Sequence, residues 1–413
     1  MEIRPILSAL LRNKTAPVLI AAQVAISLAI LANALYVVNL RLETSARPSG
    51  VADEANVFYV SKRPLQKLNH ADTLAQQRRD AEALAAIPGV QSVSFTSQMP
   101  MSRSGSNSGF STDRKQTKST ANVAMYFTAG PLIKTLGLKI IDGRDFNADD
   151  VVEADSELDD LGRKFPKGIV ITKALAEILF PGGGSAVGKT VYYGTGNDAA
   201  ETRVIGVVER LQTTTAQAGM RGEYSAIVPF RISYIFSRFA VRTEAGQRDR
   251  IMPEAEAALR KVTPSLARIR TQSVEQDRTS RYRNEKALAW MLVAVSGLLL
   301  LVTASGIVGM TTLRVAQRKK LIGVRRALGA RKRDILRYFI TENFLITSGG
   351  VVAGLVLAVL LNQLLVGQLE MSKLPIGYLA YGAATLWLLG VAAVYGPAWR
   401  AAGISPAIAT RSA

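Results

Sequence analysis

Four long runs without a charged residue constrain the fold of this 413-residue chain more than any other feature. They extend over residues 15–40, 287–313, 343–369 and 374–399, and each contains 26 or 27 residues. A helix needs about 20 apolar residues to cross the hydrocarbon core of a bilayer. Helices of soluble proteins average only about 10–14 residues. We therefore predict a transmembrane helix in each run.

The four runs divide the chain unevenly and leave a long segment between the first and the second. We predict an α-helical membrane protein with four transmembrane helices and a large α+β extracytoplasmic domain between the first and second. The predicted divisions are an N-terminal tail (1–14), helix one (15–40), the extracytoplasmic domain with stalk ends (41–286), helix two (287–313), a basic segment (314–342), helix three (343–369), helix four (374–399) and a C-terminal tail (400–413).

The distribution of Lys and Arg predicts the orientation, because cytoplasmic segments carry an excess of these residues. The two tails and the basic segment hold 15 basic and three acidic residues, whereas the connection between runs three and four has only Glu370 and Lys373. The basic residues include Arg4, Arg12 and Lys14 before the first run and Arg411 near the end. We therefore predict that both termini and the basic segment are cytoplasmic. Much of the formal net charge of +19 then reflects topology, which weakens a nucleic-acid-binding interpretation.

The first run also has features of a secretory signal peptide. Basic residues precede it, and Ala32-Asn33-Ala34 is similar to a signal-peptidase site. The apolar core of a signal peptide usually has about 7–15 residues, whereas this run continues past Ala34 through Leu35-Tyr36-Val37-Val38. These lengths favour an uncleaved membrane anchor.

Strand-like and helix-like stretches alternate in the extracytoplasmic domain. The strand-like stretches are residues 57–60, 90–96, 123–127, 191–194 and 203–208, and the helix-like stretches are 71–87, 171–180 and 253–262. Residues 99–120 are rich in Ser, Gly and Lys and predict a loop. Residues 272–286 lack Pro and Gly, and we expect a helix that continues into the second run as a stalk.

The sequence GGSAVGKT at residues 183–190 fits the phosphate-binding pattern G-x-x-x-x-G-K-[ST]. Phosphate binding needs a strand before this loop and a helix after it. Here a helix-like stretch precedes the loop and the β-rich Val191-Tyr192-Tyr193 follows it. The motif also lies in the extracytoplasmic domain, where ATP is not expected. We therefore predict that GGSAVGKT is a turn that binds no nucleotide.

Composition argues against metal and nucleophile chemistry. The chain has no cysteine, and its one histidine, His70, lies among polar residues and predicts a surface position. Residues 146–161 are acidic but contain no glycine for the turn of a calcium loop, so we predict a solvated loop. We expect no catalytic residue, no metal site and no cofactor in this chain.

The basic segment and the start of the third run read RVAQRKKLIGVRRALGARKRDILRYFITENF. Gly329 can end one helix in the left-handed conformation. A second helix then follows, with an apolar face formed by Ile335, Leu336, Phe339, Ile340 and Phe344. Two interpretations remain open at this point: a topology signal on an interfacial helix, or a pair of basic helices whose turn docks a partner.

Several stretches resemble one family, the MacB/FtsX/LolC class of ABC transporter permeases. LIGVRRALGARKRDILRYFITEN looks like its cytoplasmic signature, and the order of one membrane helix, a large domain and three membrane helices is also similar. The domain resembles the MacB-type periplasmic core domain in YFTAGPLIKTLGLKIIDGRDF, GIVITKALAEILFP, AVGKT and TRVIGVVERL, and GPAWRAAGISPAIATR is similar to the family's C-terminal ending.

The resemblance implies a non-catalytic permease subunit of the bacterial inner membrane that works by mechanotransmission. A separate cytoplasmic ATPase would bind ATP and Mg and dock on the turn between the two basic helices. Movements would pass to the extracytoplasmic domain for export or efflux. The implied coupling residues are Gly323, Arg325, Arg326, Ala327, Leu328, Gly329, Ala330 and Arg331. The implied partners are this ATPase and a second permease in a homo- or heterodimer, with room for a periplasmic adaptor and an outer-membrane channel.

Two positions depart from the family pattern: Leu321 stands where an acidic residue is frequent, and Trp399 where a basic residue is usual. Both put the detailed ATPase contacts in question and are compatible with one half of a heteromeric permease. With 14 residues before the first run, we expect no fused ATPase. Two alternatives stay open, an FtsX-like regulator of cell-wall hydrolases and an antibiotic sensor subunit, neither of which transports.

The third run contains the small-xxx-small pattern Gly350-Val351-Val352-Ala353-Gly354. Small residues at this spacing let two membrane helices approach closely. The pattern predicts packing between two permease protomers at Gly350 and Gly354, with packing inside one chain as the alternative.

Overall fold

The computed structural model describes residue 10 and residues 15–155, 158–217, 219–234, 236–369 and 374–403. The chain divides into two compact units, Met1–Glu43 with Glu285–Ala413, and Thr44–Asn284. We call the first the membrane unit and the second the α+β domain. Predictions that concern Arg4, Arg12, Lys14, Glu157, Glu370, Lys373 and Arg411 lie outside the described residues.

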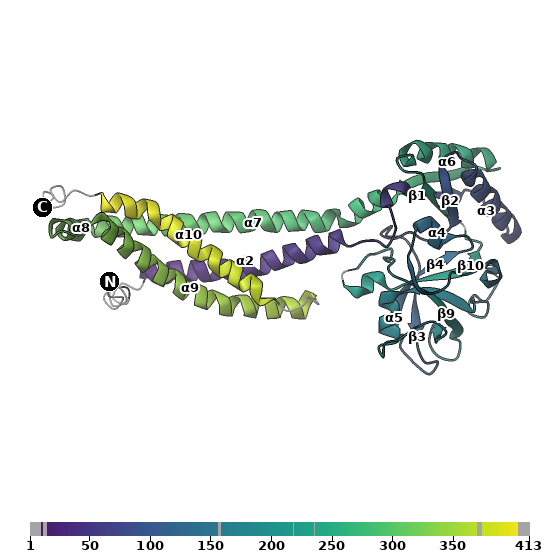
Figure 1. The fold of residues 1–413 in the computed structure, drawn as a ribbon, viewed down its shortest axis with the longest axis horizontal. Helices are drawn as coiled ribbons and strands as arrows, with labels where there is room; N and C mark the ends of the chain where they lie inside the picture. Colours follow the sequence, from purple (N-terminus) through teal and green to yellow (C-terminus); the bar gives the residue numbers. More distant parts are fainter. Residues whose placement is uncertain are drawn as a thin grey trace. The chain divides into compact units, whose positions relative to one another are not determined.

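Among the described residues, the membrane unit contains the four predicted long helices and the short helix α8 (Figure 1). The bounds are α2 Thr15–Ala46, α7 Val274–Gln317, α8 Lys319–Ala327, α9 Lys332–Leu369 and α10 Ile376–Ala402. The four long helices are long and apolar enough to cross a membrane. The polar stretch before the second run is helical from Val274, so the prediction of a continuous helix there is confirmed.

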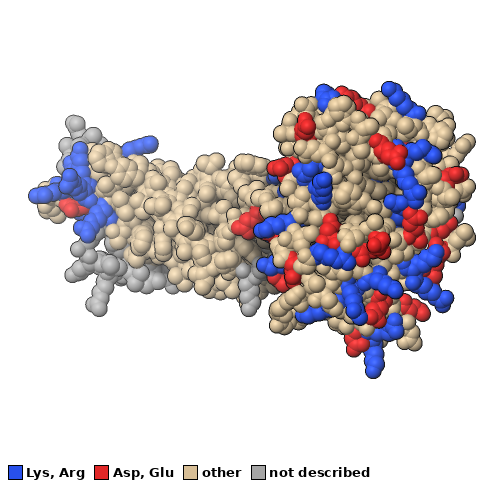
Figure 2. Space-filling view, turned by 45° about the vertical axis from the view of Figure 1, so that its right-hand side comes forward, with Lys and Arg blue, Asp and Glu red and all other residues tan. Residues whose placement is uncertain are grey.

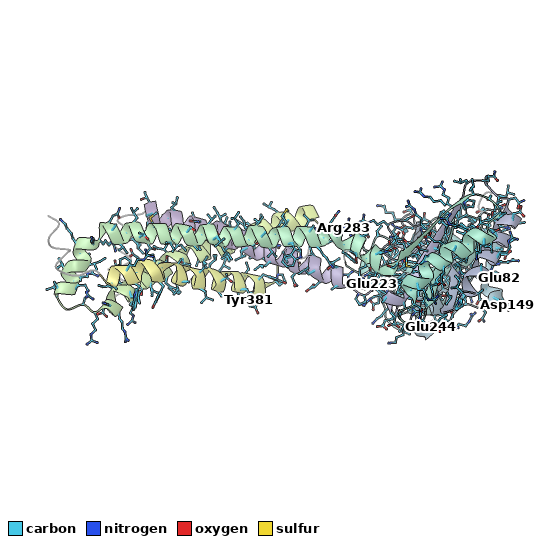
Figure 3. All side chains as sticks on the ribbon, turned by 90° about the horizontal axis from the view of Figure 1, so that it is seen from above. Glu82, Asp149, Glu223, Glu244, Arg283 and Tyr381 are labelled. Atoms are coloured by element: carbon cyan, nitrogen blue, oxygen red, sulfur yellow. The ribbon has the colours of Figure 1, made fainter. Side chains whose placement is uncertain are left out.

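Helix α2 lies at the centre of the membrane unit. The apolar stretch of 18 residues in α2 is 56% buried, whereas the corresponding stretches of α7, α9 and α10 are 17%, 33% and 22% buried. Ser27 Oγ lies 2.8 Å from Thr303 Oγ1 of α7, and Asn33 Nδ2 donates to the Ala358 carbonyl of α9 at 3.1 Å. By contrast, Tyr381 of α10 is exposed and points outward (Figure 3). The buried position of α2 favours the anchor interpretation over the signal peptide.

The structure corrects the predicted role of the glycine pair in the third run. Added Cβ atoms would lie 2.7 Å from the Ala21 carbonyl oxygen at Gly350 and 3.0 Å from Ala25 Cα at Gly354. Both glycines therefore face α2 of the same chain, where they allow the backbones of α9 and α2 to approach. This face is covered within the chain, so the small residues serve intrachain packing rather than the predicted dimer contact.

We expect Gly354→Leu to destabilise the membrane unit while leaving protomer association unchanged in the folded fraction. The leucine side chain would overlap the α2 backbone at Ala25, and overpacking of this kind costs about 1–3 kcal/mol or more. The measurement is the unfolding temperature of the detergent-purified protein, together with cross-linking between protomers. Gly349→Leu is the control, because a Cβ there meets no atom within 4 Å. Equal losses in both variants would contradict the packing role.

The α+β domain contains a four-stranded antiparallel sheet in the order β12-β1-β11-β2. Helices α3 and α6 cover one face of this sheet, where Phe58, Phe239 and Ile251 are buried (Figure 1). The bounds are β1 Val57–Pro64, α3 His70–Ala85, β2 Val90–Phe95, β11 Ser237–Thr243, α6 Arg248–Val262 and β12 Ala267–Ser273.

A second sheet has the order β4-β3-β8-β9-β7-β10-β6, and the added pairing of β4 with β10 closes six of these strands into a ring. Its buried side chains include Phe110, Val191 and Phe230. The bounds are β3 Asn107–Ser111, β4 Ala121–Thr128, α4 Leu132–Leu136, β5 Ile140–Gly143, β6 Val152–Ala154, β7 Gly168–Thr172, α5 Lys173–Leu179, β8 Thr190–Tyr193, β9 Ala200–Val208 and β10 Ser225–Ile232.

Two predicted loops contain regular structure. The Ser/Gly-rich stretch 99–120 includes β3, which pairs with β4 and β8. The acidic stretch includes the 3₁₀ turn Ala148–Asp150 and β6, which pairs in parallel with β10. Both predictions were wrong because β3 and β6 are stabilised by pairing with other strands, of which β8 and β10 are distant in sequence, and local composition does not indicate such pairing.

Candidate functional site

The basic segment forms a helical hairpin from α8, a tight turn and the start of α9. Gly329 has φ +97°, which confirms the predicted left-handed conformation. The Ala330 N–H donates to the Arg325 carbonyl at 3.0 Å, and the Gly329 N–H donates to the Arg326 carbonyl at 3.1 Å. These two bonds define a Schellman motif, which satisfies the last carbonyls of α8. A residue with a Cβ is disfavoured at this φ.

The start of α9 is capped from within the turn. The Arg331 N–H donates to Asp334 Oδ2 at 2.9 Å, so the acidic side chain satisfies a backbone group that precedes the helix. Its negative charge also lies in the first turn of the helix, where it is favourable. The two helices then pack through buried Ile322, Ile335 and Phe339. The hairpin is thus held by caps at both ends of the turn and by an apolar contact between its helices.

A polar network joins the hairpin to α7. Arg318 Nη1 donates to the Tyr338 hydroxyl at 2.6 Å, and the Arg325 guanidinium lies 5.4 Å from the centre of the same ring. Glu342 of α9 is buried and accepts a hydrogen bond from Arg314 of α7 at 3.2 Å. Separating a buried ion pair leaves two buried charges without partners, which is energetically costly, so the two side chains stay together. The Arg314–Glu342 pair therefore connects the first part of α9 with the last turns of α7.

The exposed side of the hairpin carries a stripe of apolar side chains, with basic side chains around it. Leu321, Val324 and Leu328 are 52%, 48% and 83% exposed and follow at spacings of three and four residues, which places them on one side of α8. Figure 2 shows Lys and Arg side chains gathered at this end of the membrane unit, next to a belt without charge. An exposed apolar stripe bordered by polar groups is typical of an interaction surface. The spacing of these three apolar residues is visible in the sequence, but the prediction rested on the many Lys and Arg residues around them and did not include it.

The predicted coupling residues do not all lie on the surface. Arg325, Ala327, Leu328, Gly329 and Arg331 are exposed, whereas Arg326 and Ala330 are half-buried. Gly323 is buried inside the hairpin, and its part in coupling stays a prediction. Leu321, which departs from the family pattern, belongs to the exposed stripe.

The GGSAVGKT loop lies between α5 and β8, so the predicted helix–loop–strand order is confirmed. Gly183, Gly184 and Gly188 all have positive φ, as expected of a glycine turn. The ammonium group of Lys189 lies 4.7 Å from the centre of the Phe180 ring. The loop leads into a strand, so it has no helix N-terminus to offer to phosphate groups.

We expect Lys189→Ala to leave the function of the protein intact. The substitution removes one cation–π contact with Phe180, which is worth about 0.5–1 kcal/mol at an exposed site. The measurement is equilibrium binding of ATP to the purified full-length protein, with and without the substitution. Saturable binding that is lost in Lys189→Ala would contradict this expectation.

A pocket of about 650 Å³ opens at the surface of the α+β domain beside His70, the one histidine of the chain. His70 Nδ1 lies 2.9 Å from Ser233 Oγ, and the lining also includes Asn69, Gln76 and Tyr234. The predicted surface position of His70 is correct, but its side chain is only 30% exposed. In the part of the chain that the structure describes, no group of three or more His, Asp or Glu side chains could hold a metal ion.

The architecture defines a multi-pass membrane protein of the permease type, with a large α+β domain inserted after the first of four long apolar helices. Residues 20–289 match the MacB-like periplasmic core domain, and residues 293–406 match the FtsX-like permease C-terminal domain. The chain therefore belongs to the family of MacB-like ABC transporter permeases, as its resemblance implied.

The chain is similar to two curated export proteins. It is 25% identical to the macrolide export ATP-binding/permease protein MacB of Chromobacterium violaceum over 291 residues, which cover 69% of this chain and 42% of that protein. It is 33% identical to the pyoverdine export ATP-binding/permease protein PvdT of Pseudomonas fluorescens over 130 residues, 32% of this chain and 20% of that protein. The chain thus spans less than half the length of the curated relatives it matches.

Among solved structures, the extracellular domain of the noncanonic ABC-type transporter YknZ from Gram-positive bacteria aligns with 51% of this chain and 99% of its own. The TM-score is 0.32 and the sequence identity is 17%. This likeness is too low to contribute to the assignment, which rests on the two family matches.

Proposed function

We propose that this chain is a non-catalytic permease subunit that couples ATP hydrolysis by a separate cytoplasmic ATPase to movements of its α+β domain. The observation that carries the proposal is the α8–Gly329–α9 hairpin, a rigid turn with an exposed apolar stripe and a basic border. A surface of this kind fits a groove on a partner, in which apolar contacts give affinity and arginines bond to acidic groups.

The buried Arg314–Glu342 pair would connect movements of α9 to α7 in this coupling. When the ATPase displaces the hairpin, Glu342 would move with α9 and pull Arg314 of α7 with it, because separating the buried charges is costly. Helix α7 is continuous from Val274, directly after β12, so its displacement would be passed on to the start of the helix. ATP and Mg would be held by the partner, and this chain would contribute no catalytic group.

Export is the direction of transport that the family membership favours, since both relatives named above are export proteins. The proposal places the protein in the bacterial inner membrane, with both termini and the hairpin on the cytoplasmic side and the α+β domain outside. The basic hairpin supports this orientation through the positive-inside rule. A second permease protomer would complete the transporter, and a periplasmic adaptor and outer-membrane channel could extend it.

Affinity purification of the tagged full-length chain from its own membranes tests the proposal. We expect an ABC ATPase to co-purify and a deletion strain to lose export of, or resistance to, a compound. A complex without an ATPase would overturn the coupling proposal. An ATPase partner combined with chaining or lysis defects, and with no export defect, would instead assign the chain to the regulation of cell-wall hydrolases.

A further inference from the structure

One face of the four-stranded sheet carries a cluster of arginines. The other face is covered by α3 and α6, and side chains alternate between the two faces along each strand. In the strand register, Ser61 of β1 lies opposite both Arg238 of β11 and Arg270 of β12, and Arg63 lies opposite Arg268. The register therefore brings four arginines together on the face that points away from α3 and α6.

Three of the four arginines in this cluster have no ion-pair partner among the described residues. No ion pair forms at Arg63, Arg268 or Arg270 in the part of the chain that the structure describes, and all three are exposed. Like charges placed directly opposite each other destabilise a sheet. The pair Arg63 and Arg268 therefore costs stability unless a negative group lies nearby.

Arg238 adds a buried cation to the same cluster. Its guanidinium donates to Ser61 Oγ and to the Ser97 carbonyl, both at 3.2 Å, and these acceptors are neutral. Burial lowers the pKa of Arg238, and attraction to Tyr59 and Asp277 offsets this effect only in part. The residue is thus a partly uncompensated charge beside a hollow surface.

The hollow is a groove of about 200 Å³. It is lined by Ser61, Lys62, Arg63, Ser104, Phe236, Arg238, Arg268 and Arg270. Lys62 is already paired with Asp80 on the opposite side of the sheet, so the arginines supply the unpaired charge. The hydroxyls of Ser61 and Ser104 add polar groups, and Phe236 adds an apolar wall against which the Arg238 guanidinium lies 5.8 Å from the ring centre.

We propose that this groove binds a compact anion that carries two or more carboxylate or phosphate groups. Guanidinium groups bond to such oxygens in a bidentate manner, and several groups on one ligand would neutralise several arginines at once. The small volume of the groove favours a small molecule. An added peptide strand is disfavoured, because the Thr271 N–H on edge strand β12 is already bonded to Glu256 Oε1 at 2.9 Å. The inference does not depend on the coupling proposal.

Calorimetric titration of the full-length protein in a non-ionic detergent tests this inference, with citrate as the carboxylate probe and pyrophosphate as the phosphate probe. We expect saturable binding of at least one probe, and the tighter probe identifies the class of ligand. The double variant Arg268→Ala/Arg270→Ala should weaken binding at least about tenfold, because it removes two charged donors. The control is Arg260→Ala/Lys261→Ala on α6, which removes the same charge from exposed positions that do not line the groove.

Thermal unfolding gives a second readout. Without added anion, Arg268→Ala/Arg270→Ala should unfold at a higher temperature than the unmodified protein, because the repulsion with Arg63 is relieved. The bound anion should raise the unfolding temperature of the unmodified protein and of the control variant but not of the groove variant. Absence of binding by both probes, or equal weakening in the groove and control variants, would overturn the inference.

Discussion

Replacing Gly329 with valine is expected to abolish retention of the ATPase by a permease that is still inserted in the membrane. Gly329 has φ +97°, and a β-branched residue there is strained by about 1–2 kcal/mol. The Schellman bonds of Gly329 and Ala330 would break, so Leu328 would no longer be held at the tip of the turn. Insertion depends on the apolar runs and should be unaffected. The measurement is pull-down of the ATPase by tagged permease at matched membrane levels.

Charge reversal at the same site should have the same outcome. Arg325→Glu/Arg326→Glu would place two carboxylates where the partner is expected to offer acidic groups, so attraction becomes repulsion. Lys319→Glu/Lys320→Glu is the matched control, because it makes the same change of charge at the other end of α8. Full retention of the partner and of activity in Gly329→Val and in the arginine variant would refute the docking role. Equal loss of ATPase retention in both charge variants would indicate that the segment acts only as a topology signal.

Asp80→Ala is expected to destabilise the α+β domain by about 3–5 kcal/mol. Both oxygens of Asp80 accept from Lys62 Nζ, at 2.7 and 2.6 Å, and both side chains are only 1% exposed. Burial lowers the pKa of Lys62 and raises the pKa of Asp80, whereas the partner of each group opposes this effect. Removing the carboxylate leaves a buried cation without its anion. Scanning calorimetry of the full-length protein should show the transition of this domain about 10 °C lower.

The double variant Lys62→Met/Asp80→Leu should regain most of this loss, because a well-packed apolar pair can replace a buried ion pair at little cost. Asp72→Ala is the control, since it removes a carboxylate from the exposed first turn of the same helix and should cost no more than about 1 kcal/mol. A loss in Asp80→Ala no larger than that of Asp72→Ala would contradict the role of the buried pair.

The sequence alone predicted the parts of the protein that depend on local chemistry. The four membrane helices followed from runs too long and too apolar for any other environment. The conformation of Gly329 and the helix–loop–strand context of GGSAVGKT were also correct, because both depend on residues within about ten positions along the chain. The coupling residues came from a resemblance carried by one continuous stretch, and their role stays a prediction.

Strand assignment succeeded where apolar residues cluster and failed where they do not. The stretch 57–60 was recognised as part of β1 because all four side chains are apolar or aromatic. Strand β12 reads ARIRTQS and gives little strand signal by itself. It becomes a strand through pairing with β1, which precedes it by some 200 residues. β-propensity does not indicate such pairing, because a strand is stabilised mainly by its contacts with neighbouring strands.

Only the tertiary structure decided which residues share a surface. In the structure, Gly350 and Gly354 face α2, so they make a contact inside the chain in place of the predicted contact between protomers. The tertiary structure also paired Lys62 with Asp80 and gathered arginines from three strands into one groove. A helix or turn is fixed by neighbours along the chain, and the sequence therefore determined those elements. Packing partners are fixed by how distant segments meet, and a single sequence carries no local signal of that meeting.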